Sequence, residues 1–264
     1  MQTRDELLAA LQAALKPHGL RLRGCWTAPS RKAALELPSL PHDATPAHLC
    51  MVGQVGSECW SAFSRSVFFA DGLPDPMDRW SKSIGHPLAQ RFGGRAVFPS
   101  DGPPYIPFQQ WARLADPLLQ PSPLMLQIHP DYGLWHAYRF ALVLPDRSRD
   151  EESSVPTVAA APAPPVEAAQ GGSLGQAWPA ELASTVSICA TCDGQPCLRV
   201  CPVDAFTLGQ PYAVDRCAEH LHGADLGNCM VQGCSARRAC PVGAALRYGP
   251  SHAVFHMAAF ASRH

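Results

Sequence analysis

The sequence predicts an α+β fold in which a mixed α/β sandwich precedes a smaller module organised by metal. Helical and strand patterns alternate loosely through residues 1–145, which is typical of helices packed on a sheet. Residues 146–178 are rich in proline, alanine and acidic residues, with few large apolar side chains, and predict a linker. Residues 179–264 hold eight of the eleven cysteines, so clusters or ions are expected to supply part of that domain's folding energy.

The spacing of apolar residues predicts the helices and strands of the first domain one after another. Apolar residues recur at helical spacing over 5–16, and Pro17 and Gly19 are expected to end that helix. A second helix, over 75–92, has a kink or break at Pro87 and a stop at Gly93 and Gly94. A third helix is expected over 106–114, and strands are expected over 20–26, 48–55, 95–99, 124–129 and 134–144. The turn Pro-Asp-Tyr-Gly joins the last two strands. At the end of the chain, an apolar face over 251–262 and the capping residue Ser251 predict a terminal helix.

Composition and charge argue against a nucleic-acid-binding protein and against a membrane-spanning one. A formal net charge of −1 over 264 residues lacks the basic footprint of a nucleic-acid binder, so we expect no nucleic-acid partner. No run of 18 or more apolar residues occurs, so no membrane span is expected. The opening residues do not resemble a signal peptide. We therefore expect a cytoplasmic protein with reduced thiols, in which a dense cysteine cluster binds metal.

The eight clustered cysteines fall into two groups that each end in Cys-Pro. Their spacing is Cys189-x2-Cys192-x4-Cys197-x3-Cys201-Pro202 and Cys217-x11-Cys229-x4-Cys234-x5-Cys240-Pro241. A [4Fe–4S] cluster takes four thiolates, and in two-cluster modules the cysteine before proline ligates the other cluster. This rule assigns Cys189, Cys192, Cys197 and Cys240 to cluster 1, and Cys201, Cys217, Cys229 and Cys234 to cluster 2.

Structural zinc is the alternative interpretation of the same cysteines. Two sites of four thiolates would also use all eight, and Cys189-x2-Cys192 fits a zinc knuckle. The long gaps of the second group and the paired Cys-Pro steps favour iron–sulfur clusters over zinc. The remaining cysteines, Cys25, Cys50 and Cys59, are expected to be small buried residues in or beside strands.

The cysteine segment resembles known iron–sulfur families. CATCDGQPCLRVCPVDAF (189–206) is similar to bacterial-type ferredoxin domains, and its x4 gap resembles electron-transfer subunits of molybdenum oxidoreductases. The full order of eight resembles the C-terminal domain of epoxyqueuosine reductase, although the second half departs from that family's tighter spacing. The resemblance implies a small ferredoxin-like domain with two [4Fe–4S] clusters.

The first domain resembles a corrinoid-binding family. LQIHPDYGLWHAYRFALVLP (126–145) is similar to the His-Pro-x-Phe-Gly-Gly-Trp-Phe-x-x-Arg segment of the cobalamin-processing family that decyanates and dealkylates cobalamins. The matching residues are His129, Pro130, Gly133, Trp135 and Arg139, with Leu134 in place of the second glycine. That family and epoxyqueuosine reductase share a nitroreductase-like α+β domain, so the resemblance implies such a fold and a bound corrinoid such as cobalamin.

The resemblance also implies site residues. His129, Arg139 and Trp135 would contact the corrinoid or a substrate, although His129 also suits a turn-capping residue and Trp135 a core residue. Asp101, in SDGPPYIPF, corresponds to the proposed proton donor of epoxyqueuosine reductase. Enclosure would raise the pKa of such a carboxyl group, as a general acid requires. A plain turn residue is the other interpretation of Asp101.

Three functions follow from these observations. The first is an iron–sulfur oxidoreductase that passes electrons from a redox partner protein through two clusters to a cofactor or small-molecule substrate, such as cobalamin, in the first domain. The second is a non-enzymatic ferredoxin-type carrier with a docking domain, which predicts an occluded first-domain pocket and allows the module to swing on its linker. The third is a zinc-stabilised cobalamin chaperone without redox chemistry.

Overall fold

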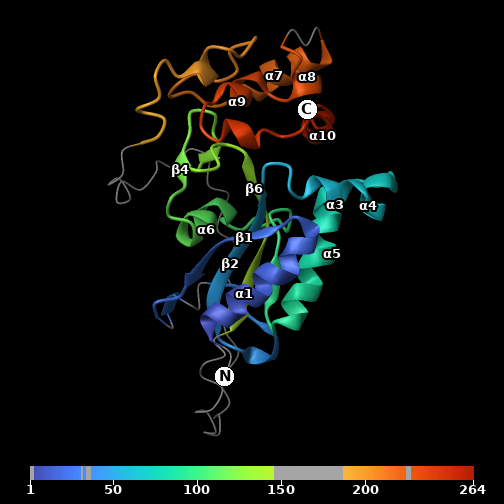
Figure 1. Ribbon diagram of the computed structural model, residues 1–264, viewed down its shortest axis with the longest axis vertical. Coiled ribbons are helices and arrows are strands. Elements are labelled where there is room, and N and C mark those ends of the chain that lie inside the picture. The colour runs from blue at the N-terminus through green and yellow to red at the C-terminus, as the bar shows by residue number, and fades with distance from the viewer. Residues whose placement is uncertain (1–2, 31, 34–36, 146–186, 224–226) are drawn as a thin grey trace, which may run out of the picture.

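The computed structural model describes residues 3–30, 32–33, 37–145, 187–223 and 227–264 (Figure 1). The predicted mixture of helices and strands in an α+β arrangement is confirmed. The predicted linker, 146–178, lies outside the described residues, as do the first residues of the predicted second domain. No helix of the described residues is long and apolar enough to cross a bilayer.

The described helices and strands alternate in the first part, and the described elements after residue 187 are helices and turns. The helices are α1 Arg4–Leu15, α3 Trp60–Ser64, α4 Val67–Ala70, α5 Pro76–Arg91, α6 Phe108–Ala115, α7 Val214–His222, α8 Cys229–Gln232, α9 Ser235–Ala239 and α10 Pro250–Ala261. The strands are β1 Arg21–Thr27, β2 Pro46–Val55, β3 Arg95–Val97, β4 Gln120–Pro121, β5 Gln127–Ile128 and β6 His136–Pro145. Short 3-10 turns lie at Lys16–His18, Pro41–Asp43, Pro196–Leu198 and Ala244–Leu246.

A four-stranded antiparallel sheet, in the order β1-β2-β6-β3, is the frame of the first part. Successive side chains of a strand point to opposite faces, and both faces of this sheet are apolar. One face, with Val52 and Phe140, packs against α1 and α5. The other face, with Met51 and Val143, packs against α6. The sheet is therefore the middle layer between two helical layers (Figure 1).

Local sequence signals fix the start of the chain. Thr3 and Glu6 form a capping box, in which the Glu6 amide donates to the Thr3 hydroxyl and the Thr3 amide donates to the Glu6 carboxylate. Gly19 ends the following turn with a positive φ of 63°. A Cβ at Gly19 would lie 2.1 Å from the carbonyl oxygen of Glu58, so glycine is required for this close approach as well as for the turn.

Four features differ from the sequence-based expectations. Helix α5 continues through Pro87 without a break, because burial of Ile84 and Leu88 on the same face offsets one missing hydrogen bond. Only Gln127–Ile128 of the expected strand 124–129 is extended, and it pairs with β4 instead of β6. Helix α10 is capped by Gly249 with proline at its first position, so Ser251 lies inside the first turn and is not the cap. The short helices α3 and α4 were not predicted.

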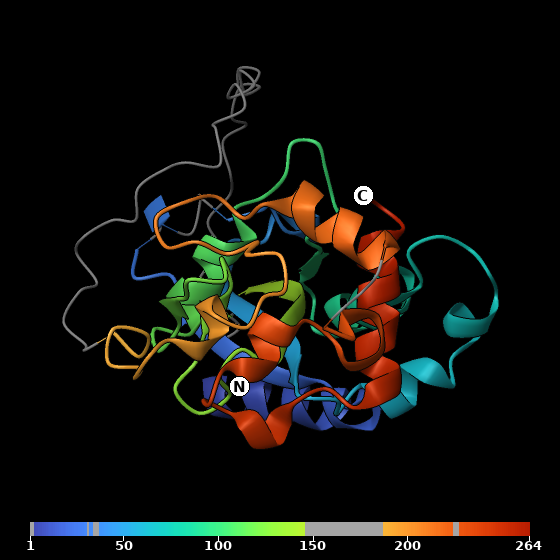
Figure 2. The same ribbon diagram turned by 90° about the horizontal axis from the view of Figure 1, so that it is seen from above.

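The cysteine-rich part stacks on the end of the sheet where β6 begins (Figures 1 and 2). Leu124, Ile128 and Leu134 of the first part share one apolar cluster with Ala205, Phe206 and Ala236 of the second. Three hydrogen bonds cross the contact. The Ile188 amide donates to the Gln120 Oε1 at 2.9 Å, and the Gly249 amide donates to the Ser57 hydroxyl oxygen at 2.9 Å. The Arg237 Nε donates to the Leu134 carbonyl at 3.2 Å. The two parts are thus docked on each other.

Candidate metal centre

Seven of the eight cysteines lie on turns, in loops or at the ends of short helices, and Cys217 lies within α7. Cys197 lies in a 3-10 turn, Cys229 begins α8, and Cys234 and Cys240 flank α9. Residues with positive φ, such as Gln195 (40°), reverse the chain between them. Turns of this kind direct successive backbone amides toward one point, and six of the eight cysteines pack into the apolar cluster between the two parts.

The four thiols assigned to cluster 1 lie next to one another. Burial, and then the neighbouring thiols of Cys240, Cys197 and Cys192, raise the pKa of Cys189 to about 11. Burial, followed by the thiols of Cys240 and Cys192, also raises the pKa of Cys197. Because the effect of one titrating group on another falls off with distance, these contributions relate Cys189 and Cys197 to the other two thiols of the set.

The four thiols assigned to cluster 2 form a second group. Burial raises the pKa of Cys234 to about 11, and the thiols of Cys229 and Cys217 add to this effect. Burial also raises the pKa of Cys217, with contributions from Cys201 and Cys229. In the described part of the chain, thiols that raise one another's pKa belong to the same set of four. Their role as ligands stays a prediction.

Backbone amides are directed at several of these sulfurs. The Ala205 amide donates to the Cys201 Sγ at 3.3 Å. Hydrogen bonds from backbone amides also lower the pKa of Cys234 and of Cys240, against the larger effect of burial. Amides aimed at sulfur stabilise the thiolate form, which is the form that binds metal. The donor set therefore fits an anionic metal–sulfur group.

A single metal ion and a metal–sulfur cluster need different arrangements of ligands. Among the described residues, no three His, Cys, Asp or Glu side chains are grouped so that they could hold a metal ion. A zinc site needs four ligands that all reach one ion, with Zn–S distances of about 2.3 Å. In a [4Fe–4S] cluster each thiolate binds a different iron, so the sulfurs stand farther apart. The choice between zinc and iron–sulfur clusters stays a prediction.

His129 is buried in a polar network at the turn after β5. Its Nδ1 accepts a hydrogen bond from the Asp131 amide at 3.0 Å, and its Nε2 is 3.7 Å from the Asp116 carboxylate. Its ring stacks on Tyr132 with centroids 4.2 Å apart. Burial lowers the pKa of His129, while Asp116 acts in the opposite direction. This is the geometry of a turn-capping histidine, held by partners of its own chain.

Arg139 and Trp135 have other partners. Arg139 Nε donates to the Gln54 Oε1 at 2.7 Å. Trp135 is buried, with the Arg237 guanidinium 4.6 Å from its ring centroid. The structure shows no contact between His129 and Arg139 in the described residues. Each of the three residues predicted to contact a corrinoid has partners within its own chain, and their role in binding that cofactor stays a prediction.

Asp101 lies in an exposed turn. Its carboxylate accepts a hydrogen bond from the Phe98 amide at 3.1 Å and pairs with the Lys82 ammonium at 2.9 Å. The side chain is 43% exposed. The enclosed carboxyl group expected of a proton donor is therefore not what the structure shows, and its contacts match the turn-residue interpretation.

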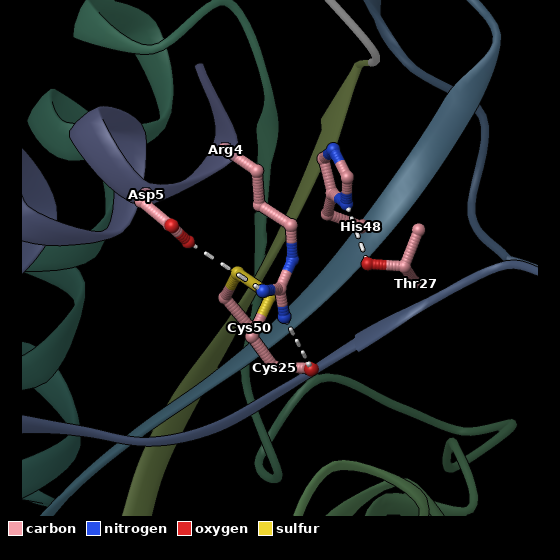
Figure 3. Close-up of a disulfide and its surroundings, with 6 residues drawn as sticks. All are labelled: Arg4, Asp5, Cys25, Thr27, His48 and Cys50. Carbon is pink, nitrogen blue, oxygen red and sulfur yellow. Dashed lines mark hydrogen bonds and ion pairs between the residues drawn. A yellow bond between two sulfur atoms is a disulfide. The ribbon is translucent and has the colours of Figure 1, made fainter.

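The cysteines outside the cluster sets include an unexpected disulfide. Cys25 on β1 and Cys50 on β2 face each other in the strand register, with Cα atoms 4.1 Å apart, and their sulfurs are bonded (Figure 3). The expectation of reduced thiols throughout was wrong for this pair, because antiparallel pairing brings residues 25 apart in sequence into direct opposition. Cys59 is a buried free thiol, as predicted.

Sequence reasoning missed a histidine pair on α10, here called the α10 histidines, His252 and His256. Their Nε2 atoms are 3.0 Å apart, and the His252 Nδ1 is 3.0 Å from the Ser57 hydroxyl. The His252 ring stacks between Trp60 and Tyr248. The His-x3-His spacing was a visible signal, because residues four apart share one face of a helix.

A second missed group is the buried pair of Arg23 and Asp116, whose side chains are 3.6 Å apart. No local sequence pattern predicts this pair, since the two residues lie far apart in sequence.

Comparison with known proteins gives no matching family model, and no curated protein matches the chain.

Proposed function

We propose that this chain is an electron-transfer protein that holds two [4Fe–4S] clusters. Cys189, Cys192, Cys197 and Cys240 would bind cluster 1, and Cys201, Cys217, Cys229 and Cys234 would bind cluster 2. The observation that supports the proposal is the division of the eight thiols into two groups of four, together with amides directed at their sulfurs. A set made only of cysteine is typical of iron–sulfur ligation.

We further propose that the cysteine-rich part is a ferredoxin-like module and the first part a nitroreductase-like docking domain. The clusters, when bound, would supply one-electron transfer at potentials set by burial and by hydrogen bonds to sulfur. The chain's own contribution is to exclude water and to aim amides such as that of Ala205. Electrons would come from a redox partner protein.

The carrier is favoured over the corrinoid enzyme by the state of the first part. His129 and Trp135 are buried, and Arg139 is held by Gln54. Side chains held by partners of their own chain suit a docking domain, as in the carrier hypothesis. The hydrogen bonds of Arg237 and Ile188 across the contact also support a module that works in a fixed position, without swinging on a tether.

The first experiment is anaerobic purification with iron, sulfide and zinc analysis. We expect about eight irons and eight sulfides per chain, since each of two clusters carries four irons. Cys240→Ala and Cys201→Ala should each remove about half of the iron. Cys59→Ala is the matched control, because Cys59 is a buried free thiol outside both sets, and it should leave the iron content unchanged. Colourless protein with two zinc ions per chain would overturn the proposal.

Double variants test which cysteines share a cluster. Cys189→Ala combined with Cys240→Ala should lose no more iron than either single variant, because both residues are assigned to cluster 1. Cys189→Ala combined with Cys201→Ala should lose nearly all of it, because the crossover rule assigns these two residues to different clusters. The opposite pattern would show that the Cys-Pro cysteines bind within their own sequence groups. Added cob(II)alamin should keep its free spectrum, and a shift specific to this protein would restore the corrinoid enzyme.

A further inference from the structure

A cavity of about 650 Å³ opens beside Cys189, at the junction of the two parts. Its walls come from three stretches of chain, within residues 121–125, 187–195 and 207–211. This volume falls in the range of small-molecule sites. The cavity is distinct from the cluster sites, although the Cys189 residue forms part of its wall.

The cavity has an uncharged lining. Apart from Cys189, none of the described residues that line it has an ionisable side chain, and prolines, Met125 and Leu208 supply apolar surface. A nucleotide cofactor or another anion would find no cation here to balance its charge, and desolvating such a charge without a partner is costly. The lining therefore selects an uncharged ligand.

Apolar side chains stand open at this cavity. Met125 is 59% exposed and Leu208 is 67% exposed. Met125 also adopts a left-handed backbone conformation, with φ of 59°, in the turn closed by its amide and the Ser122 carbonyl at 3.0 Å. Exposed apolar groups gathered around a concavity mark interaction sites, and unusual backbone conformations of non-glycine residues cluster at such sites.

A polar anchor is also present. Ser122 lines the cavity, and its buried hydroxyl has no hydrogen-bond partner among the described residues. A buried hydroxyl without a partner is costly, and rotation of the Ser122 side chain toward the cavity would let it donate to a ligand carbonyl. Gln195, on the opposite wall, uses its amide to donate to the Cys189 carbonyl at 3.0 Å, which ties the wall to the cluster loop.

We infer that this cavity binds a small uncharged quinone. The inference rests on the proposed function, because Cys189 makes the cavity adjacent to cluster 1 only if that cluster is present. A quinone matches each feature: its ring is apolar, it carries no charge, and its carbonyl oxygens accept hydrogen bonds. Its position against Cys189 is where a molecule that exchanges electrons with cluster 1 would lie.

Binding to the anaerobic holoprotein, measured by ultrafiltration, tests the inference. The probe is 2,3-dimethyl-1,4-naphthoquinone, whose substituted ring resists addition of thiols, and anthraquinone-2-sulfonate is the charged comparison. We expect the uncharged quinone to bind at least tenfold more tightly. Leu208→Glu should weaken its binding at least tenfold, and Ser122→Ala about fivefold through loss of one hydrogen bond. Leu114→Glu is the matched control, because Leu114 is a 51% exposed leucine of α6 outside the cavity lining, and it should change nothing.

Each outcome bears on one proposal. Equal binding of both quinones, or unchanged binding in Leu208→Glu and Ser122→Ala, would overturn the inference. Circular dichroism of the variants checks that they fold. Iron and sulfide are measured on the same samples: protein with two clusters that binds no quinone overturns this inference alone, whereas cluster-free protein that still binds quinone overturns the proposed function.

Discussion

Gly133 is the residue at which the docking of the two parts can be tested most sharply. It adopts a positive φ of 56°, and a Cβ there would lie 2.0 Å from the carbonyl oxygen of Val242, two residues after Cys240. Gly133→Ala therefore has two destabilising effects: it strains the backbone at a positive φ, and it places a Cβ against the Val242 carbonyl. Gly72→Ala has only the first, because Gly72 has a φ of 70° and nothing within 4 Å of its Cβ position.

The magnitudes follow from this pair. An alanine in the left-handed region costs about 1 kcal/mol at either position. Ordinary contact for a Cβ begins near 3.4 Å, so at Gly133 the two backbones must separate by the difference from 2.0 Å, about 1.4 Å. Overpacking of this kind costs about 1–3 kcal/mol more. We expect Gly72→Ala to lower the free energy of unfolding by about 1 kcal/mol, and Gly133→Ala to lower it by about 2–4 kcal/mol.

The assay is anaerobic denaturation of both variants, followed by tryptophan fluorescence and by cluster absorbance. Because Val242 follows the Cys240 loop, Gly133→Ala should also shift the cluster 1 signal and leave cluster 2 unchanged. If Gly133→Ala were no more destabilising than Gly72→Ala, the contact between Gly133 and Val242 would contribute nothing, and the docked arrangement would be refuted.

Three further predictions concern the packing of the first part and its contact with α10. Ser57→Ala should lower the free energy of unfolding by about 1–2 kcal/mol, because it removes the hydrogen-bond partner of the buried His252. Ser83→Ala, at an exposed position of α5, should lower it by less than half as much. Equal losses for the two variants in denaturation curves would contradict this. Replacing Cys25 and Cys50 together by alanine should lower it by about 3 kcal/mol, from the loop of 25 residues that the disulfide closes, and an unchanged denaturation midpoint would show that the bond does not form. Burial, and then the charge of Arg139, lowers the pKa of His252 to about 3 and that of His256 to about 2. The unfolded chain therefore takes up protons at a higher pH than the folded chain, and the free energy of unfolding should fall as pH drops from about 6.5 toward 4. A denaturation midpoint independent of pH in this window would contradict the burial of these rings.

The sequence was most informative where spacing and chemistry act locally. The assignment of Cys189 and Cys240 to one cluster came from a ligation rule and stays a prediction, although the Cys240 thiol contributes to the raised pKa of Cys189. Helix α1 and strand β2 were predicted because their apolar side chains recur at the periods of a helix and of a strand buried between two layers. Such signals are carried by neighbours in the chain, so they survive without knowledge of the tertiary structure.

Long-range pairing left no comparable trace. The disulfide of Cys25 with Cys50 depends on the register between β1 and β2, and a shift of one residue would have turned the two thiols to opposite faces. The pair of Arg23 with Asp116 depends on how α6 packs over the sheet. Neither register nor packing is written in the local periodicity, so no inspection of the separate segments could have predicted these contacts.

The segment HPDYGLW (129–135) has a structural role that the resemblance did not indicate, while its corrinoid role stays a prediction. It was singled out by its resemblance to a corrinoid-binding segment, yet in this structure its residues hold the cysteine-rich part. Gly133 lies against Val242, the Leu134 carbonyl accepts from Arg237, and Trp135 lies under the same guanidinium. Arg237 lies on α9 between Cys234 and Cys240, so a side chain between two proposed ligands is fixed to the segment just before β6. The backbone and the Trp135 ring of this segment are therefore occupied by contacts within the chain. For the proposed carrier we accordingly expect electrons to leave through the surface beside Cys189, where a cavity is open.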